Sequence, residues 1–183
     1  MKKLTKQQKE VREMKSRLPL AKAPVRKKLE QKTAAQLIPV ADKWFSKYIR
    51  LRDCEFTGTD WVGECIDGCG RKLIVLDSQG KWKLSANNGH FISRGVYSLR
   101  YSEENCSLQA AFCNAWRDKE DMLEGYRTGL ALKCGEDTVK ELKRLSKLPE
   151  AYRRPSKPDL LQIISDAKQE VEYMLAHKEN YQR

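Results

Sequence analysis

The sequence predicts an α+β fold in which helices flank a small β region that contains closely spaced cysteines. Apolar residues recur at helical spacing towards both ends of the chain. Residues 54–91 are instead rich in glycine, β-branched residues and turn signals, a composition typical of short strands. Five of the six cysteines fall between positions 54 and 113, so most of them belong to or follow this β region.

The size and composition of the chain are those of one soluble domain with extensions. It has 183 residues, of which 40% are apolar and 33% charged, and no apolar run approaches the roughly 20 residues that a membrane span needs. The first residues, MKKLTKQQKEVREMK, are basic and no apolar stretch follows them, so we expect no secretory signal and a cytosolic protein. Disulfides are therefore not expected.

Residues 1–32 form a basic N-terminal arm, with twelve lysines and arginines against three glutamates. The whole chain carries a net charge of +11. A dense segment of one sign repels itself and binds polyanions, because cations on phosphates release counterions. We therefore expect a nucleic acid as partner of the arm. The alternative is a solvated arm with no specific partner.

The region after the arm is expected to begin with a helix over residues 39–52. Apolar residues repeat along it at helical spacing, and Pro39 suits a first helical turn. Further along, LIVL and KWKL flank DSQG, which predicts a β-hairpin. The stretch ECIDGCG, residues 64–70, predicts a cysteine knuckle at a tight turn, and the chain is expected to become helical again after Asn105.

Two further helices are predicted near the C-terminus. Thr138 and Glu141 have the spacing of a capping box, and so have Ser156 and Asp159. The second of these helices has one apolar face, formed by Leu160, Ile164, Ala167, Val171 and Met174. A proline-rich, basic linker, LPEAYRRPSKP, joins the two helices.

Cys65 and Cys69 enclose three residues, a spacing that suits two thiolates on one zinc ion. A second pair is needed to complete a tetrahedral site. Cys113 could supply one ligand, but the position three residues before it is Ala110. Cys54 or Cys106 could supply the fourth ligand, or there is none. The alternative is that these cysteines are small buried residues of an apolar core.

His90 is a candidate for catalysis because of its neighbours. It follows Asn87, Asn88 and Gly89, and Asn105 and Asn114 come 15 and 24 residues later. Asparagine amides can orient an imidazole or bind a hard cation. A one-metal phosphodiesterase needs such a set, in which histidine deprotonates water and a divalent ion polarises the phosphate. The alternative is a structural histidine, which is the commoner case.

Several motifs together resemble the NinG family of lambdoid phages. They are YIRLRD at 48–53, GHFISR at 89–94, then Asn105, Gln109 and Cys113-Asn114, and CGEDTVKELKRLS at 134–146. The similarity covers roughly residues 40–176, in order and with near-matching gaps. Beyond it, the N-terminal arm is similar to the family only in being basic.

The resemblance implies a small ββα-metal core of the HNH type, flanked by helices, within residues 33–148. Residues 149–183 are then a linker and a C-terminal helix. The implied activity is that of a phage recombination endonuclease that cleaves branched DNA, such as a Holliday junction or D-loop, in the host cytoplasm. The implied cofactors are Mg²⁺ or Mn²⁺ for catalysis and Zn²⁺ for structure. A homodimer would suit the two-fold symmetry of a junction, and other phage recombination proteins are possible partners.

The resemblance also assigns roles to single residues. His90 matches the histidine that activates water, Asn105 the residue that positions the active-site loop, and Asn114 a contact of the divalent metal. The implied zinc ligands are Cys65, Cys69 and Cys113. Asn87 would offer an oxygen to the catalytic metal.

The chain departs from the family pattern at five places, one of which is the stretch after Cys113-Asn114, which reads AWRDKED where the family has a small glycine-bearing stretch. Asn87 replaces an aspartate or histidine, Ser107 replaces a frequent histidine, and Ala110 replaces the third zinc cysteine. The first cysteine pair is also one residue wider than in the family. Glu120 or Asp121 is a candidate for the missing metal carboxylate.

Arg94, Arg100 and Arg117 lie near the proposed site in the sequence, and we expect them to contact phosphates. Ordinary exposed arginines are the alternative. Two other functions compete with the nuclease. One is a catalytically inactive, zinc-supported DNA-binding accessory protein of recombination. The other is an interaction protein that dimerises through an exposed apolar face of the C-terminal helix.

Overall fold

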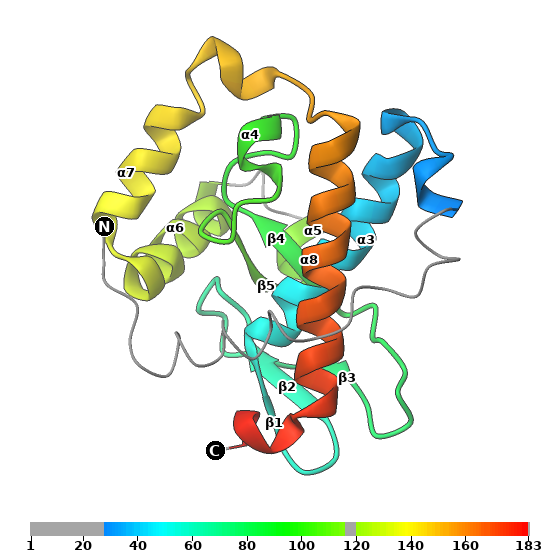
Figure 1. Ribbon diagram of the computed structural model, residues 1–183. Coiled ribbons are helices and arrows are strands. Elements are labelled where there is room, and N and C mark those ends of the chain that lie inside the picture. The colour runs from blue at the N-terminus through cyan, green and yellow to red at the C-terminus, as the bar shows by residue number, and fades with distance from the viewer. Residues whose placement is uncertain (1–27, 116–119, 183) are drawn as a thin grey trace.

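Two small antiparallel sheets carry the middle of the described chain, and helices lie beside them (Figure 1). The computed structural model describes residues 28–115 and 120–182. The first sheet has the order β1-β2-β3, with strands Cys54–Phe56, Trp61–Glu64 and Lys72–Leu76. The second pairs β4, Ala86–His90, with β5, Cys106–Ala110. The α+β class predicted from the sequence is confirmed.

The helix α3, Ala34–Arg52, begins five residues before the predicted start. Thr33 and Gln36 form a capping box: the Gln36 N–H donates to Thr33 Oγ1 at 3.3 Å, and the Thr33 N–H donates to Gln36 Oε1 at 3.0 Å. Pro39 therefore lies inside the helix, and its prediction as a first-turn residue was wrong. The cap satisfies the N–H groups that open a helix, which a proline five residues later does not do.

The predicted hairpin around DSQG is confirmed, with a short antiparallel pairing beyond its turn. Asp77 O accepts from the Gly80 N–H at 2.9 Å, and one isolated bridge joins Leu76 to Trp82. The KWKL segment pairs with β3, since the Asp77 N–H donates to Lys81 O at 3.2 Å and the Lys83 N–H donates to Val75 O at 3.0 Å. The strand β3 also pairs with β2, which the sequence did not predict.

The strand β5 was not predicted, because the chain was expected to become helical after Asn105. It pairs with β4 in the register Ala86↔Ala110 and His90↔Cys106, and the short helix α5, Ala111–Ala115, follows it. All five β5 residues are buried. The five residues do alternate between apolar and polar, which is a strand signal, but the run is short and leads directly into the helix α5.

The last helices are α6, Glu120–Cys134, α7, Glu136–Leu145, and α8, Lys157–Ala176. Three short segments complete the element list: α4, Tyr97–Arg100, and the 3₁₀ turns η1, Pro149–Tyr152, and η2, Lys178–Tyr181. The predicted cap at Thr138 was wrong, because α7 begins at Glu136 and the Thr138 hydroxyl donates to Cys134 O at 2.8 Å.

The capping box of Ser156 and Asp159 at the start of α8 is confirmed. The apolar face of α8 is also confirmed and is buried, in large part against α3, which lies beside it in Figure 1. This coverage removes the exposed apolar face on which dimerisation through this helix depended. The last predicted segment, 149–183, therefore shares cores with the middle segment. Within the described residues, no helix is long and apolar enough to cross a membrane.

Candidate functional site

His90 is the last residue of β4, where the chain leaves the sheet for the loop 91–105. Its side chain is nearly buried, with 8% of the residue exposed, and Nε2 lies 3.1 Å from Arg100 O. A small cavity of about 60 Å³ adjoins it, lined also by Asp42 and Asn88. His90 is therefore a ring held in place by the loop, at the edge of a narrow hollow.

Asn105 holds this loop closed. Its side chain is fully buried, and Oδ1 accepts from the Ile92 N–H at 2.7 Å. Its Nδ2 donates to Ile92 O at 3.0 Å and to Leu99 O at 2.9 Å. One amide thus satisfies three backbone groups at the two ends of the segment 92–99. This geometry fits the loop-positioning role that the resemblance implies.

Arg100 and Arg94 differ in what they can offer a ligand. Arg100 forms a bidentate pair with Asp42 of α3, at 2.8 and 2.6 Å, and donates from Nη1 to Arg94 O at 2.9 Å. Its hydrogen bonds to Asp42 raise the pKa of Arg100, although burial opposes them. Arg100 therefore ties the loop to α3 and has few donors left for a phosphate. Arg94 is exposed at the cavity, and Arg117 lies outside the described residues.

Asn87 and Asn114 occupy other positions in the β4–β5 hairpin than His90. Successive side chains of a strand point to opposite faces, so Asn87 lies on the face of Gly89, away from His90. That face is tightly covered, since a Cβ at Gly89 would lie 2.8 Å from Tyr126 Cε2. Asn114 belongs to α5, which begins at the end of the hairpin opposite to His90.

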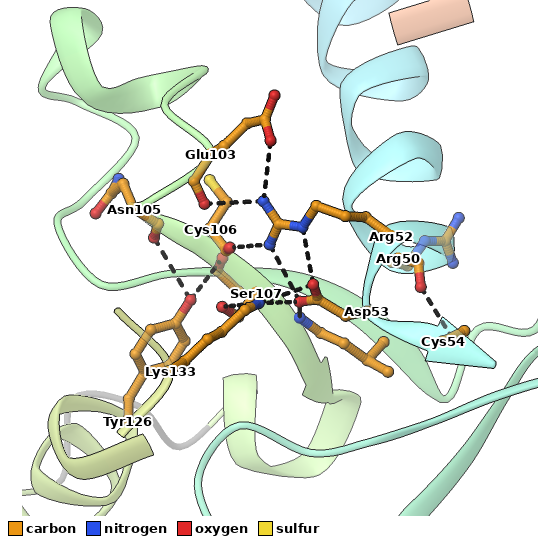
Figure 2. Close-up of polar contacts among 12 residues, drawn as sticks. Arg50, Arg52, Asp53, Cys54, Glu103, Asn105, Cys106, Ser107, Tyr126 and Lys133 are labelled. Atoms are coloured by element: carbon orange, nitrogen blue, oxygen red, sulfur yellow. Dashed lines mark hydrogen bonds and ion pairs between the residues drawn. The ribbon is translucent and has the colours of Figure 1, made fainter. Parts of the chain in front are cut away.

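A buried network of charges holds β5 from the side that does not pair with β4 (Figure 2). Its centre is Asp53, whose side chain is 11% exposed. The carboxylate accepts from Arg52 Nε at 2.8 Å, from Lys133 Nζ at 2.7 Å and from the Leu108 N–H at 2.9 Å. Lys133 Nζ also donates to Ser107 Oγ at 3.2 Å. Arg52 and Asp53 end the YIRLRD motif, so that motif has a structural function here.

The same network reaches the loop of His90. Arg52 Nη2 donates to Cys106 O at 2.7 Å. The Tyr126 hydroxyl of α6 donates to Gly89 O at 3.0 Å and lies 3.5 Å from Asn105 O (Figure 2). The residues on both sides of the loop are therefore fixed by side chains from α3 and α6.

Burial and neighbouring charges have opposite effects on the pKa values of Asp53 and Lys133 at the centre of this network. Burial alone would raise the pKa of Asp53, but hydrogen bonds and charges from Arg52 and Lys133 outweigh it and lower that pKa. Burial also lowers the pKa of Lys133, which the charge of Asp53 only partly offsets. The ionised carboxylate is thus the favoured form of Asp53 in the folded protein.

A cleft of about 930 Å³ opens beside the network, between the first sheet, α6 and the C-terminal residues 180–182. Its charged lining residues are Arg52, Asp53, Glu55, Glu64, Lys72 and Lys133. Both signs are equally represented among them, so the cleft has no electrostatic preference for phosphate.

The cysteine knuckle and α5 bring three thiols together. The sulfurs of Cys65, Cys69 and Cys113 all lie within 4.8 Å of one another, and those of Cys69 and Cys113 are 3.7 Å apart. The Ala110 N–H donates to Cys65 Sγ at 3.2 Å, a bond that stabilises a thiolate. The predicted convergence of these three cysteines is confirmed, and the cluster can bind a metal such as zinc. Cys54 and Cys106, the expected sources of a fourth ligand, do not belong to it.

The thiols of the cluster affect each other's protonation. Burial and the neighbouring thiols raise the pKa of Cys113 to about 12. The pKa of Cys69 is lowered, because hydrogen bonds from the Arg71 N–H and the neighbouring thiols outweigh its burial. Three thiolates so close together repel one another, and a bound cation relieves that repulsion.

The sequence profile of the family described as Bacteriophage Lambda NinG protein matches residues 1–178. The chain belongs to the NinG family. No curated protein and no solved structure was found to match it significantly. The family match is wider than the resemblance over residues 40–176, because it includes the basic arm.

Set against the NinG pattern, the structure explains one departure. Ala110 is buried beside Cys65, at the edge of the cysteine cluster. The alanine thus occupies the place where the pattern implies a further zinc ligand. The other three implied ligand positions are still cysteines. The predicted metal residues Glu120 and Asp121 have side chains outside the described part of the chain.

Sequence reasoning missed the network around Asp53. Lys133 lies 80 residues from Asp53, and no local pattern connects the two. No local sequence pattern identified Tyr126 as part of the network either. The available signal was the sequence RLRD at the end of a predicted helix, where an acidic residue next to arginines can form a buried pair.

Proposed function

We propose that this NinG-family protein is an endonuclease that hydrolyses phosphodiester bonds in branched DNA during phage recombination. The observation that supports it most is the clamp of Asn105, which holds the loop against the strand end that carries His90. The order β4, α4, β5, α5 supports this proposal, because two antiparallel strands followed by a helix, with α4 in the loop between them, are compatible with a ββα unit. The three-cysteine cluster lies at the other end of the same hairpin, beside Ala110.

The contact of His90 with the backbone supports a role as general base. A carbonyl oxygen can only accept, so the bond between Arg100 O and Nε2 requires the proton on Nε2. In the neutral ring, Nδ1 is then the basic nitrogen. A base of this kind takes a proton from the attacking water, a contribution worth about 10²–10⁴-fold in rate.

Cations gather at the loop of His90. Lys143 Nζ of α7 lies 5.8 Å from the centre of the Phe91 ring, and the Arg154 guanidinium lies 5.9 Å from that of Tyr97. Arg94 is exposed on the same loop. We propose that these three side chains contact the phosphates that flank the scissile bond, with the basic arm adding affinity without sequence specificity.

The described residues do not assemble a magnesium site at His90. Asn87 lies on the other face of β4, and the nearby carboxylate of Asp42 is neutralised by Arg100. These residues therefore account for a general base but not for a divalent-ion site. A requirement for Mg²⁺ or Mn²⁺ is a separate part of the proposal, which cutting with either metal or with EDTA tests.

One observation favours a second candidate function, a catalytically inactive DNA-binding accessory protein. The cavity at His90, about 60 Å³, is too small to admit a nucleotide, and the ring itself is nearly buried. A protein that keeps the scaffold for binding needs no open site there.

The decisive experiment is cleavage of a labelled four-way junction and of a linear duplex with the same arms. Wild type, His90→Ala and His177→Ala are compared with Mg²⁺, Mn²⁺ or EDTA. His177 is the matched control, because it is the other histidine and caps α8. We expect metal-dependent cutting of the junction that falls about 10²–10⁴-fold in His90→Ala only, with unchanged junction binding. Tight binding without cutting in either metal would instead establish the accessory function.

A further inference from the structure

Asp67 is the middle residue of the cysteine knuckle, between Cys65 and Cys69. Its carboxylate accepts two hydrogen bonds from Gln109 Nε2, at 3.1 and 2.9 Å. Burial raises the pKa of Asp67, and interactions with Gln109 and with the thiols of Cys113 and Cys65 partly offset that rise. The carboxylate therefore lies on the side of β5, near Cys113 and Cys65 and farther from Cys69.

The charge of Asp67 has no counterpart in the described chain. No lysine, arginine or histidine among the described residues pairs with it, and its side-chain partners are a neutral amide and thiols. A partly buried carboxylate is normally paired with a cation or bound to a metal, because it loses hydration. Three thiols and one unmatched carboxylate together form the ligand set of a divalent cation.

The other sources of a fourth ligand are accounted for within the described residues. Position 110 is an alanine, whose N–H already bonds Cys65 Sγ. The Cys54 thiol is directed to Arg50 O at 3.0 Å. Cys106 is buried opposite His90 at the far end of the hairpin.

We infer that a zinc ion is bound by the thiolates of Cys65, Cys69 and Cys113 together with the carboxylate of Asp67, which replaces the ligand missing at Ala110. Zinc accepts carboxylate oxygen at about 2.0–2.2 Å beside thiolate sulfur at about 2.3 Å. The three sulfurs form a tighter group among themselves than they do with Asp67. Binding therefore includes a rotation of the Asp67 side chain toward Cys69.

The backbone of Asp67 is packed closely against α6, so the knuckle is fixed while the carboxylate is held by Gln109 alone among side-chain amides. A Cβ at Gly125 of α6 would lie 3.0 Å from Asp67 O, so the helix passes close to the knuckle backbone. Gln109 Nε2 holds both carboxylate oxygens. It can keep one of them when the other binds the metal, which is how outer hydrogen bonds orient metal ligands.

The test measures metal binding and needs no nuclease activity. Full-length wild type, Asp67→Ala, Asp67→Ala/Ala110→Cys and Asp137→Ala are titrated with zinc against a chromophoric chelator. Asp137 is the matched control, because its carboxylate is fully exposed on α7. X-ray absorption of the zinc-loaded wild type and cobalt spectra of all four proteins identify the bound atoms. Circular dichroism checks that each variant is folded.

We expect one zinc per chain with three sulfurs and one oxygen in the wild type. Asp67→Ala should lower zinc affinity about 10–100-fold and alter the cobalt spectrum. The double variant should regain affinity and show a stronger thiolate-to-cobalt absorption, and Asp137→Ala should match the wild type. Four sulfurs in the wild type, no bound zinc, or an Asp67→Ala protein with unchanged affinity and spectrum would overturn the inference. The last of these results would assign the fourth position to water or to another residue.

Discussion

Two polar clusters lie along the same edge of β5. They differ in whether the buried carboxylate of the cluster is paired with cations. At one, the Leu108 N–H donates to Asp53, whose carboxylate is matched by Arg52 and Lys133. At the other, the Ala110 N–H donates to the sulfur of Cys65, beside the Asp67 carboxylate, which forms no ion pair within the described chain. The first cluster is complete and structural. The second has the charge of a binding site, and comparing the two distinguishes support from function.

This edge of β5 also explains why the sheet stops at two strands. An unpaired strand edge normally presents free N–H and C=O groups, which promote aggregation. Here a carboxylate, a thiol, Arg52 and the Ile66 N–H, which donates to Leu108 O at 3.0 Å, satisfy that edge. Side chains and the knuckle thus replace a third strand.

The largest effect is expected from breaking the matched cluster, in which Asp53 is paired with Arg52 and Lys133. Asp53→Ala should lower the free energy of unfolding by about 3–5 kcal/mol, because it leaves Arg52 and Lys133 without their carboxylate. Denaturant unfolding measures the loss. The matched control, Asp137→Ala, removes a fully exposed carboxylate and should leave stability unchanged. An equal effect of the two substitutions would show that burial of Asp53 contributes nothing.

Removing the metal should affect only the second cluster, which contains the thiols of Cys65, Cys69 and Cys113. With zinc at 100 times its dissociation constant, binding should stabilise the wild type by about 2.7 kcal/mol. Cys69→Ser should abolish this zinc-dependent shift in thermal unfolding. Cys134→Ser is the control, because Cys134 lies outside the three-cysteine cluster, and it should keep the shift. A shift that survives in Cys69→Ser would place the bound zinc elsewhere.

A smaller change removes one cation from the matched cluster and keeps its packing. Lys133→Met should cost about 1.5–3 kcal/mol, the range of hydrogen bonds to charged groups. The loss is smaller than for Asp53→Ala because Arg52 still pairs with Asp53. A double-mutant cycle with Asp53→Asn measures the coupling, and additive effects would mean that the two side chains do not interact.

The smallest effect is the pH dependence of the matched cluster. The folded-state pKa of Asp53 is lowered, so its contribution is complete above its unfolded pKa of about 3.9. The contribution is lost as the pH falls from there through the folded pKa. The stability difference between wild type and Asp53→Asn should therefore shrink below about pH 4. A difference that stays constant down to pH 2.5 would contradict the lowered pKa.

Local signals in the sequence were sufficient for part of this molecule. The cap at Ser156 and the apolar face of α8 depend on residues three or four positions apart, and both were predicted correctly. The cysteine spacing similarly predicted the convergence of the three thiols.

The rest depends on distant partners. The strand β5 alternates apolar and polar residues, but its polar residues, Ser107 and Gln109, are buried by contacts from distant segments, and the strand leads directly into α5. The pairs of Asp53 with Lys133 and of Asp42 with Arg100 join residues far apart in the chain. No period or cap marks such pairs, and they decide which arginine is available to a ligand.

The contact of Gly129 with the knuckle couples the two ends of the β4–β5 hairpin. A Cβ at this position would lie 1.8 Å from Ile66 O, so helix and knuckle meet backbone to backbone, with no side chain between them to absorb a displacement. One turn away, Tyr126 of the same helix holds Gly89 O, next to His90. The knuckle and the strand end that carries His90 are thus both packed against one turn of α6, so the position of each is set relative to the same helix.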